Sequence, residues 1–199
     1  MKAILFDLGN VLVRYDRVAN IEALAAASQS DVATISAILD EVGELLTVGE
    51  LSGDHLHQLL IDRAGMIPSQ TEFARAASTG ITPDKAALEY ALALQSREDV
   101  TVAVISNTID LHVAWLDANV PQLAEIDLVM MSNEVHLAKP DPAIFELALE
   151  LLDLSAERAV MVDDIAENIA GARAVGMTGI VHREWAQTRA QLEDWLARG

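Results

Sequence analysis

Polar residues able to do chemistry follow four short, continuous apolar runs of the sequence. They are Asp7 after Ala3–Phe6, Ser106 and Asn107 after Val102–Ile105, Lys139 behind Leu128–Met131, and Asp163 with Asp164 after Ala159–Val162. Carboxylates suit a hard cation such as Mg²⁺, and a carboxylate can also act as a nucleophile. A lysine with hydroxyl and amide donors can stabilise a transferring phosphoryl group. If the fold brings these residues together, they indicate a phosphoryl-transfer site that binds Mg²⁺.

Each residue also has a purely structural interpretation. Asp7 alone suits a turn, Ser106 suits a helix N-cap, and Lys139 suits a solvated loop. Asp163 and Asp164 could cap the following helix, but two adjacent carboxylates repel and one cap needs only one of them. A bound divalent cation would offset that repulsion. Four such coincidences behind four apolar runs favour a functional site over four separate structural roles.

The elements that must position these residues alternate along the chain. The four apolar runs and a fifth, Gly179–Val181, are typical of strands buried on both faces. The segments between them have helical patterns: Pro83–Ser96 with Thr82 as N-cap, Pro142–Leu152 with Asp141 as N-cap, Ile165–Val175 and Trp185–Leu196. This alternation predicts an α/β fold with a doubly wound parallel sheet. Ligands bind such sheets outside the carboxyl ends of the strands, where the polar groups stand.

One stretch does not alternate, because no strand is evident between Val13 and Thr82. Helices are expected at Val18–Ala27, Val32–Leu39, His55–Ala64 with Ser52 as N-cap, and Glu72–Ser78, with turns at Gly49–Gly53 and Gly65–Ser69. We therefore expect a small helical cap at residues 14–82, inserted after the first strand. Residues 1–13 and 83–199 would then form the α/β catalytic core.

Composition sets further limits on function. The chain has 199 residues, with 31 acidic and 13 basic side chains and a net charge of -18. Such a balance argues against nucleic acid or an anionic membrane as a partner. The sequence has no cysteine and no run of 18 apolar residues, and its first apolar run is too short for a signal peptide. We expect a cytoplasmic protein without a membrane span; the pattern leaves the oligomeric state open.

The polar groups resemble the motifs of the haloacid-dehalogenase-like hydrolase superfamily, in the order of that family and over essentially the whole chain. The segments similar to its four motifs are Phe6–Leu12, Ile105–Thr108, Lys139–Phe145, and Val162–Asp164 with Asn168–Ala172 and Gly176. The resemblance implies a Rossmann-like core with a helical cap that closes over the substrate. It also implies a Mg²⁺-dependent phosphatase that acts on a small phosphorylated molecule through an aspartyl phosphate.

The resemblance assigns a role to each matching residue. Asp7 would be the nucleophile and a Mg²⁺ ligand, and Lys139 would neutralise Asp7 and the developing charge. The other implied roles are phosphoryl binding by Ser106 and Asn107, and metal binding by the Gly9 carbonyl, by Asp164 directly, and by Asp163 in support.

The sequence departs from the family pattern at Gly9, where phosphatases of the family usually carry a second aspartate that acts as general acid and base. Losing such a group typically costs about 10²–10⁴-fold in rate. The pattern Asp7-Leu8-Gly9-Asn10 is nevertheless similar to that of bacterial sugar-phosphate phosphatases, notably ones acting on glucose 1-phosphate. We therefore expect sugar 1-phosphates or acyl phosphates, whose leaving groups depend less on an acid, to be preferred over sugar 6-phosphates.

Other side chains could replace the missing acid or contact the substrate, although a structural or solvated role is expected for each. They are Asp16, His55, His57, His112 and His136 as replacement acids, and Arg14 and Tyr15 as substrate contacts.

Two other functions remain open. Metal-independent dehalogenases of the family also lack the second acid, but small polar residues typically replace their acidic pair, so Asp163 and Asp164 argue against this function. A binding protein on a catalytically impaired scaffold has only Gly9 in its favour. A phosphomutase would need an acid at that same position.

Overall fold

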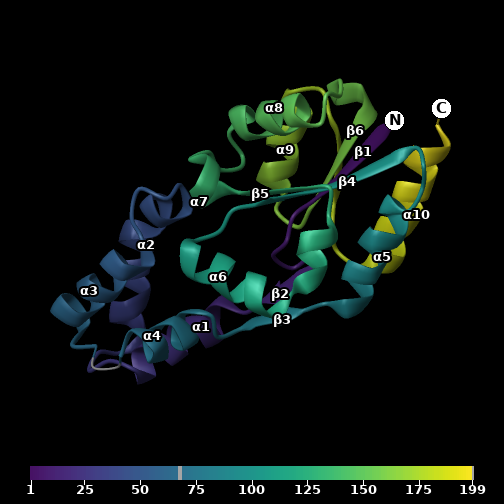
Figure 1. The fold of residues 1–199 in the computed structure, drawn as a ribbon. Helices are drawn as coiled ribbons and strands as arrows, with labels where there is room; N and C mark the ends of the chain where they lie inside the picture. Colours follow the sequence, from purple (N-terminus) through teal and green to yellow (C-terminus); the bar gives the residue numbers. More distant parts are fainter. Residues whose placement is uncertain (67–68, 199) are drawn as a thin grey trace.

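The computed structural model describes residues 1–66 and 69–198, and its centre is a five-stranded parallel sheet. The strand order is β5-β4-β1-β6-β7. The strands are β1 (Lys2–Phe6), β4 (Val100–Ser106), β5 (Leu128–Met131), β6 (Ala159–Asp163) and β7 (Thr178–Val181). All five lie where apolar runs predicted them. The predicted doubly wound α/β fold is therefore confirmed (Figure 1).

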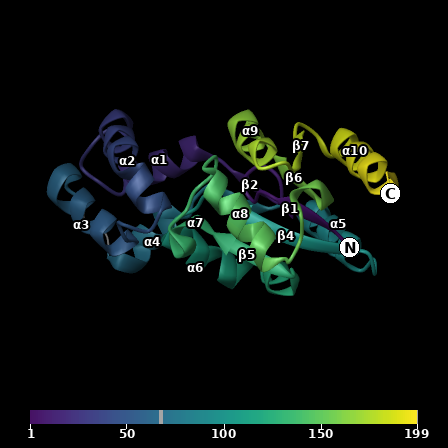
Figure 2. The same ribbon diagram turned by 90° about the horizontal axis from the view of Figure 1, so that it is seen from above.

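Helices cover both faces of this sheet, as Figures 1 and 2 show. One face carries α5 (Lys85–Gln95), α6 (Asp110–Asn119) and α10 (Trp185–Ala197), and the other carries α8 (Pro142–Leu151) and α9 (Ala166–Ala174). Side chains of β1 alternate between the two layers: Ile4 and Phe6 pack with α5 and α10, while Ala3 and Leu5 pack with α8 and α9. Two separate cores thus fix β1 at the centre of the sheet.

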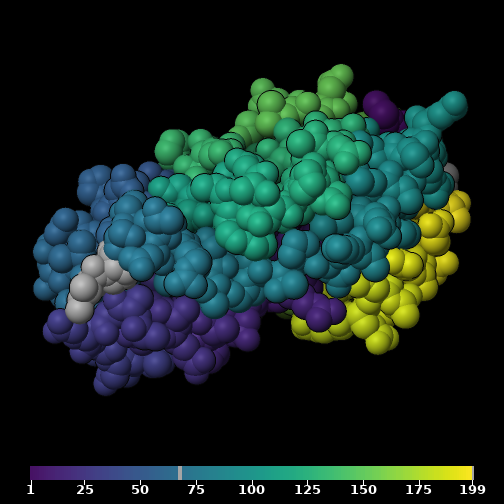
Figure 3. Space-filling view, turned by 60° about the horizontal axis from the view of Figure 1, so that its bottom comes forward, coloured from purple at the N-terminus to yellow at the C-terminus, as the bar shows by residue number. Residues whose placement is uncertain are grey.

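Four helices near the N-terminus form a third, separate core. They are α1 (Arg17–Ala26), α2 (Val32–Thr47), α3 (Gly53–Ala64) and α4 (Gln70–Ala77), called here the cap helices. Their buried faces pack on one another through residues such as Leu24, Ile38, Leu56 and Phe73. Figure 3 shows α1–α3, in purple and blue, at the opposite end of the molecule from the yellow α10. The predicted boundaries at 13/14 and 82/83 stay a prediction.

The helices in this region are close to their predicted positions. Ser52 caps α3 as expected, since its hydroxyl accepts the His55 N–H. Helix α2 continues eight residues beyond the expected end at Leu39, through Gly43, to Thr47. Of the turn expected at Gly65–Ser69, positions 67 and 68 lie outside the described residues.

The prediction that no strand lies between Val13 and Thr82 is wrong. Strands β2 (Val13–Tyr15) and β3 (Ile81–Pro83) pair antiparallel where the chain enters and leaves the cap helices. Three residues are too few to give a periodic pattern, so the sequence carried no signal for them. Thr82 is consequently not an N-cap, and Pro83 pairs with Val13 instead of starting α5. Asp84 caps α5 because its carboxylate accepts the Ala87 N–H at 3.1 Å.

Four further elements of the core were not predicted from the sequence patterns. They are helix α6 (Asp110–Asn119), the short helix α7 (Ser132–Val135) and the 3-10 helices η1 (Pro121–Glu125) and η2 (Ala156–Arg158). Helix α6 buries a single residue, Leu116, in its interior-facing surface, so its apolar stripe is too weak to detect. Among the described residues, no helix is both long and apolar enough to cross a membrane.

Hydrogen bonds to the main chain of the cap helices attach them to the core. They run from the Gly53 N–H to the Asp110 carboxylate at 2.8 Å, from the Ser132 hydroxyl to the Thr47 carbonyl at 2.6 Å, and between His136 Nδ1 and the Val48 carbonyl at 2.8 Å. Together with β2 and β3, these contacts hold the cap helices over the carboxyl edge of the sheet.

Candidate active site

The predicted site residues meet at the carboxyl edge of the sheet, where the strand order reverses around β1. Asp7 follows β1 and Asp163 ends the neighbouring strand β6. Lys139 reaches between them, with its Nζ 2.7 Å from Asp7 Oδ1 and 2.7 Å from Asp163 Oδ2. This edge is where the topology of an open α/β sheet places a ligand.

The Lys139 ammonium has all three of its N–H groups in use. Besides the two carboxylates, it donates to the Ile105 carbonyl at 2.7 Å. Its side chain is 1% exposed and that of Asp163 is fully buried, so the group is held in one position. A lysine with no spare donor can fix and neutralise Asp7, whereas a bound phosphoryl group would need donors from other residues.

The Asp7 carboxyl is strongly perturbed by its surroundings. Burial raises its pKa to about 6; the Lys139 ammonium opposes this rise, and the Asp163 carboxylate adds to it. Such a combination of burial and charged neighbours is typical of a reacting group.

A divalent cation fits the site by charge and by donor chemistry. Asp7, Asp163 and Asp164 place a carboxylate oxygen each within 4.8 Å of one another, and Lys139 supplies a single positive charge against three negative ones. Among the described residues, the Gly9 carbonyl oxygen accepts no hydrogen bond, so it is free to act as a further oxygen ligand. Hard oxygen donors of this kind suit Mg²⁺.

The two adjacent aspartates have different surroundings. Asp163 accepts hydrogen bonds from Lys139, from the Ile165 N–H at 2.8 Å and from the Asn168 amide at 3.0 and 3.1 Å. Asp164 is half-buried, and among the described residues its carboxylate accepts a hydrogen bond from the Asn10 amide alone, at 3.2 Å. Asp164 thus has more of its carboxylate free than Asp163 has, and the direct metal role expected of Asp164 and the supporting role of Asp163 stay predictions.

Ser106 and Asn107 lie at the end of β4 on the same edge. The Asn107 side chain is bound to the Lys139 backbone: its amide donates to the Lys139 carbonyl at 2.7 Å and its oxygen accepts the Lys139 N–H at 2.8 Å. Asn107 therefore positions the lysine, and its backbone N–H and the second N–H of its amide remain for a phosphoryl oxygen. The Thr108 N–H is taken by the Ser132 hydroxyl at 2.9 Å. Ser106 lines the cavity above the site.

Gly9 is not required by the backbone. Its φ lies outside the left-handed region, and a Cβ atom there would stand 3.8 Å from Asp7 Oδ2, an ordinary contact distance. A Cβ atom would therefore fit, so neither backbone conformation nor close approach requires glycine at this position.

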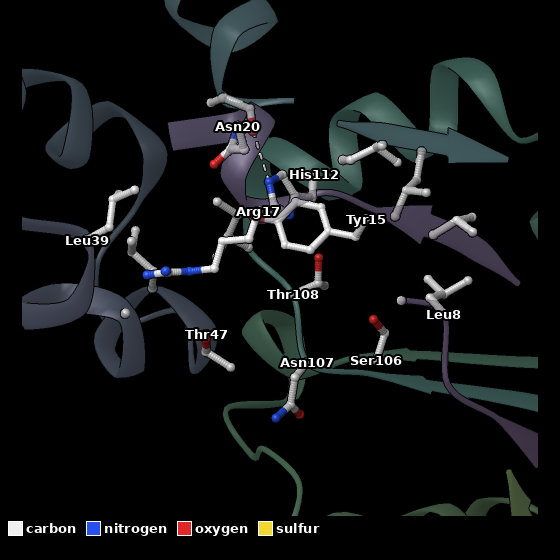
Figure 4. Close-up of a pocket in the computed structure, with 18 of the residues that line it drawn as sticks. Leu8, Tyr15, Arg17, Asn20, Leu39, Thr47, Ser106, Asn107, Thr108 and His112 are labelled. Carbon is white, nitrogen blue, oxygen red and sulfur yellow. Dashed lines mark hydrogen bonds between the residues drawn. The ribbon is translucent and has the colours of Figure 1, made fainter. Parts of the chain in front are cut away.

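A cavity of about 350 Å³ opens between this edge and the cap helices. It is lined by Tyr15, a predicted substrate contact, and by His112, a predicted replacement acid, and their rings lie 5.4 Å apart (Figure 4). The remaining groups have structural partners or lie apart from the cavity: Asp16 caps α1, His55 binds Ser52, His57 stacks on Phe73, His136 binds the Val48 carbonyl, and Arg14 pairs with Asp84.

Two supporting residues were not given roles from sequence. Asn168 fixes Asp163, and Asn10 connects Asp164 to the Tyr15 N–H, which its side-chain oxygen accepts at 3.2 Å. Asn10 has a left-handed φ of 57°, which asparagine tolerates better than most residues. The sequence features that could have identified these two residues are an asparagine directly after Gly9 and a second asparagine, five positions after Asp163.

Comparison with known proteins identifies relatives in sequence and in fold. A sesquiterpene phosphatase from Aspergillus oryzae is 28% identical over 188 residues, which cover 90% of this chain and 88% of that protein. A HAD family enzyme from Bacteroides thetaiotaomicron, crystallised with magnesium and inorganic phosphate, aligns with a TM-score of 0.83 and 22% identity over 94% of this chain and 98% of its own. A 2-haloacid dehalogenase from Pseudomonas syringae aligns with a TM-score of 0.67 and 23% identity over 100% and 99% of the chains.

The structural alignments establish the shared fold, and the family assignment rests on the sequence itself. Residues 1–176, which contain every motif named above, match the family model of the haloacid dehalogenase-like hydrolases. The chain belongs to the haloacid dehalogenase-like hydrolase family.

Proposed function

We propose that this hydrolase is a Mg²⁺-dependent phosphatase of small phosphorylated molecules, which reacts through an aspartyl phosphate on Asp7. The observation that carries the proposal is the Asp7–Lys139–Asp163 cluster with Asp164 beside it, next to the cavity that Gly9 and Ser106 line. The sesquiterpene phosphatase is a relative over nearly the whole chain, and the Bacteroides enzyme was crystallised with magnesium and phosphate, which supports the proposal.

In this mechanism Lys139 holds Asp7 Oδ1, and Oδ2, which faces Gly9, attacks phosphorus. The new oxygen–phosphorus bond forms while the bond to the leaving oxygen breaks, and that oxygen departs with the electron pair. Water then attacks the aspartyl phosphate, which releases phosphate and restores Asp7. Ser106 and the Asn107 N–H are the proposed donors to the phosphoryl oxygens.

The cation would be held by Asp7, the Gly9 carbonyl and Asp164, with Asp163 in support. When bound, Mg²⁺ would supply positive charge against the phosphate oxygens and the carboxylates. This donor set also argues against the metal-independent dehalogenase alternative, which has no need for Asp164.

The glycine at position 9 leaves the departing oxygen without a carboxylic acid to protonate it. For esters of the same organic group, those whose leaving group is a weaker base are therefore favoured, so acyl phosphates and, among sugar phosphates, 1-phosphates should react faster than phosphates of primary alcohols. Comparing a sugar 1-phosphate with the matching 6-phosphate at equal concentration tests this preference; faster turnover of the 6-phosphate would contradict it.

The test of the function is hydrolysis of 4-nitrophenyl phosphate with and without Mg²⁺, in the natural protein and in Asp7→Asn. Asp194→Asn is the matched control, since it makes the same chemical change on the exposed face of α10. We expect Mg²⁺-dependent turnover that Asp7→Asn abolishes and Asp194→Asn leaves intact. Acid-quenched protein should carry one phosphoryl group on Asp7. Halide release from 2-haloacids without metal, and no phosphate release, would support the dehalogenase instead.

A further inference from the structure

We propose that the substrate's organic group is a hydrocarbon, bound in the cavity between the sheet edge and the cap helices, and that Gly43 sets the depth of that cavity. This inference rests on the proposed phosphatase function and deepens it, because it names the chemical class of the group that carries the phosphate.

The cavity walls distant from Asp7 are apolar. Leu24 of α1, Leu39 and Leu46 of α2, Leu56 of α3 and Ile109 before α6 all line it. Leu24, Leu46 and Leu56 also belong to the buried core of the cap helices, so the cavity extends into that core. A hydrocarbon gains free energy by entering such a space, whereas each hydroxyl of a sugar would lose hydrogen bonds to water.

The polar residues on the cap side of the cavity are largely engaged with the protein. Asn20 donates its amide to the Ala76 and Ala77 carbonyls at 3.2 and 2.6 Å. His112 Nε2 lies 3.0 Å from the same Ala77 carbonyl and therefore acts as its donor. The Asn20 amide and the His112 ring are therefore not free to replace the water around a polyhydroxylated substrate, which leaves the Tyr15, Thr47 and Thr108 hydroxyls as polar groups of the cavity wall.

On the cap side of the cavity, positive charge is neutralised by a neighbouring carboxylate. Arg17, which reaches across the opening in Figure 4, forms an ion pair with Asp40 of α2. Burial lowers the pKa of His112, so this imidazole is neutral near pH 7. A second phosphate or a carboxylate on the substrate would find no free positive charge among the residues that line the cavity.

Gly43 stands in the middle of α2, one helical turn after Leu39 and one before Thr47, on the face that lines the cavity. A Cβ atom at this position would meet no other atom within 4 Å, and its φ is not left-handed. Glycine inside a helix is less stable than alanine, and neither packing nor backbone conformation requires it here. Its effect is to leave open space in the cavity wall.

The experiment compares phenyl phosphate with a series of 4-alkylphenyl phosphates, with glucose 1-phosphate as the polar alternative. The phenol leaving group stays nearly constant along the series, so only the hydrocarbon length changes. We expect kcat/KM to rise about fourfold per added methylene until the cavity is full, as the burial of one methylene predicts. We also expect glucose 1-phosphate to react more slowly than the longer members of the series.

The variants Gly43→Ala and Gly43→Phe test the assigned residue. Gly43→Phe should remove the gain from the longer alkyl groups, so that kcat/KM relative to phenyl phosphate no longer rises along the series. Gly43→Ala separates helix stabilisation from cavity filling, because it should raise the melting temperature and shorten the tolerated chain only slightly. Circular dichroism shows whether Gly43→Phe folds; if it does not, Gly43→Leu replaces it in the same comparison.

The outcomes separate the inference from the function beneath it. A flat alkyl series, or glucose 1-phosphate ahead of the longer alkylphenyl phosphates, overturns the hydrocarbon cavity while Mg²⁺-dependent phenyl phosphate turnover keeps the phosphatase. A rising series that Gly43→Phe does not shorten overturns the role of Gly43. If no phosphate ester turns over, the proposed function fails. Calorimetric binding of phenylphosphonate and 4-butylphenylphosphonate then tests the cavity alone, and equal affinities would overturn it.

Discussion

Introducing a carboxylic acid at position 9 tests directly whether the departing oxygen lacks a group that can protonate it. The change Gly9→Asp fits the structure, because a Cβ atom there lies 3.8 Å from Asp7 Oδ2 and the backbone is not left-handed. The negative charge of Asp7 raises the pKa of a neighbouring carboxyl, which helps the new acid to stay protonated before the first step. We expect Gly9→Asp to accelerate the hydrolysis of phosphates of primary alcohols.

The size of the effect follows from general acid catalysis, which contributes about 10²–10⁴-fold. Among the described residues, Asp7 Oδ2 is the one non-neighbouring heavy atom within 4 Å of a Cβ atom at position 9, so the new side chain gains little support there. We therefore expect the lower end of that range, about 10²-fold or about 2.7 kcal/mol. A 4-nitrophenyl leaving group needs no proton, so its release should change little. The variant should therefore raise the ratio of alkyl to aryl phosphate turnover by about 10²-fold.

The assay measures kcat/KM for ethyl phosphate and 4-nitrophenyl phosphate in the natural protein, Gly9→Asp, Gly9→Asn and Gly9→Ala. Asparagine reproduces the shape of aspartate without its acidic proton, and alanine adds the Cβ atom alone. If Gly9→Asp and Gly9→Asn alter the two substrates alike, residue 9 does not approach the leaving oxygen, and the leaving-group argument is refuted.

Three further predictions concern the charged cluster. Lys139→Met should abolish turnover and destabilise the protein by about 3–5 kcal/mol at pH 7 in urea unfolding, since it leaves Asp7 and Asp163 buried without their cation; an unchanged midpoint would contradict this. Because burial raises the Asp7 pKa from 3.8 to about 6, the folded metal-free protein binds an extra proton in that window. Its free energy of unfolding should fall as pH rises from 3.8 to about 6, and Asp7→Asn should flatten that slope. Asn107→Ala removes two hydrogen bonds to the Lys139 backbone and should destabilise the protein by about 1–3 kcal/mol with a lower kcat; a change in KM alone would favour direct substrate contact.

The sheet and the site edge were predictable because their signals are local. Continuous apolar runs such as Ala159–Val162 mark strands buried on both faces, and the polar residues behind them mark the edge where those strands end. The order of the strands along the chain then indicates which of these polar residues can lie close together. Capping by Ser52 and Asp141 was likewise predictable, because each side chain binds an N–H group two or three residues away.

Other features depend on contacts between distant segments and left no such signal. Strands β2 and β3 are separated by the whole of the cap helices and pair only through tertiary structure. By residue type, the Asn107 side chain could donate a hydrogen bond to a phosphoryl group. In the structure it forms hydrogen bonds with the Lys139 backbone instead. The apolar character of the cavity depends on how α1, α2 and α3 are arranged around it, which residue spacing alone does not determine.

The way the cap helices are attached has a consequence for how such a protein can diverge. The core reaches them through main-chain groups: the Gly53 N–H and the Thr47 and Val48 carbonyls. Only Gly49 and Gly53 are constrained by close approach there, since a Cβ atom would lie 2.1 Å from the Asn133 carbonyl oxygen at the first and 2.5 Å from the Leu111 side chain at the second. These three attachments use no side-chain atom of the cap segment, so side chains on the inner wall can change without breaking them. Mutations can rebuild the inner wall for a new substrate while the join to the catalytic half is inherited unchanged.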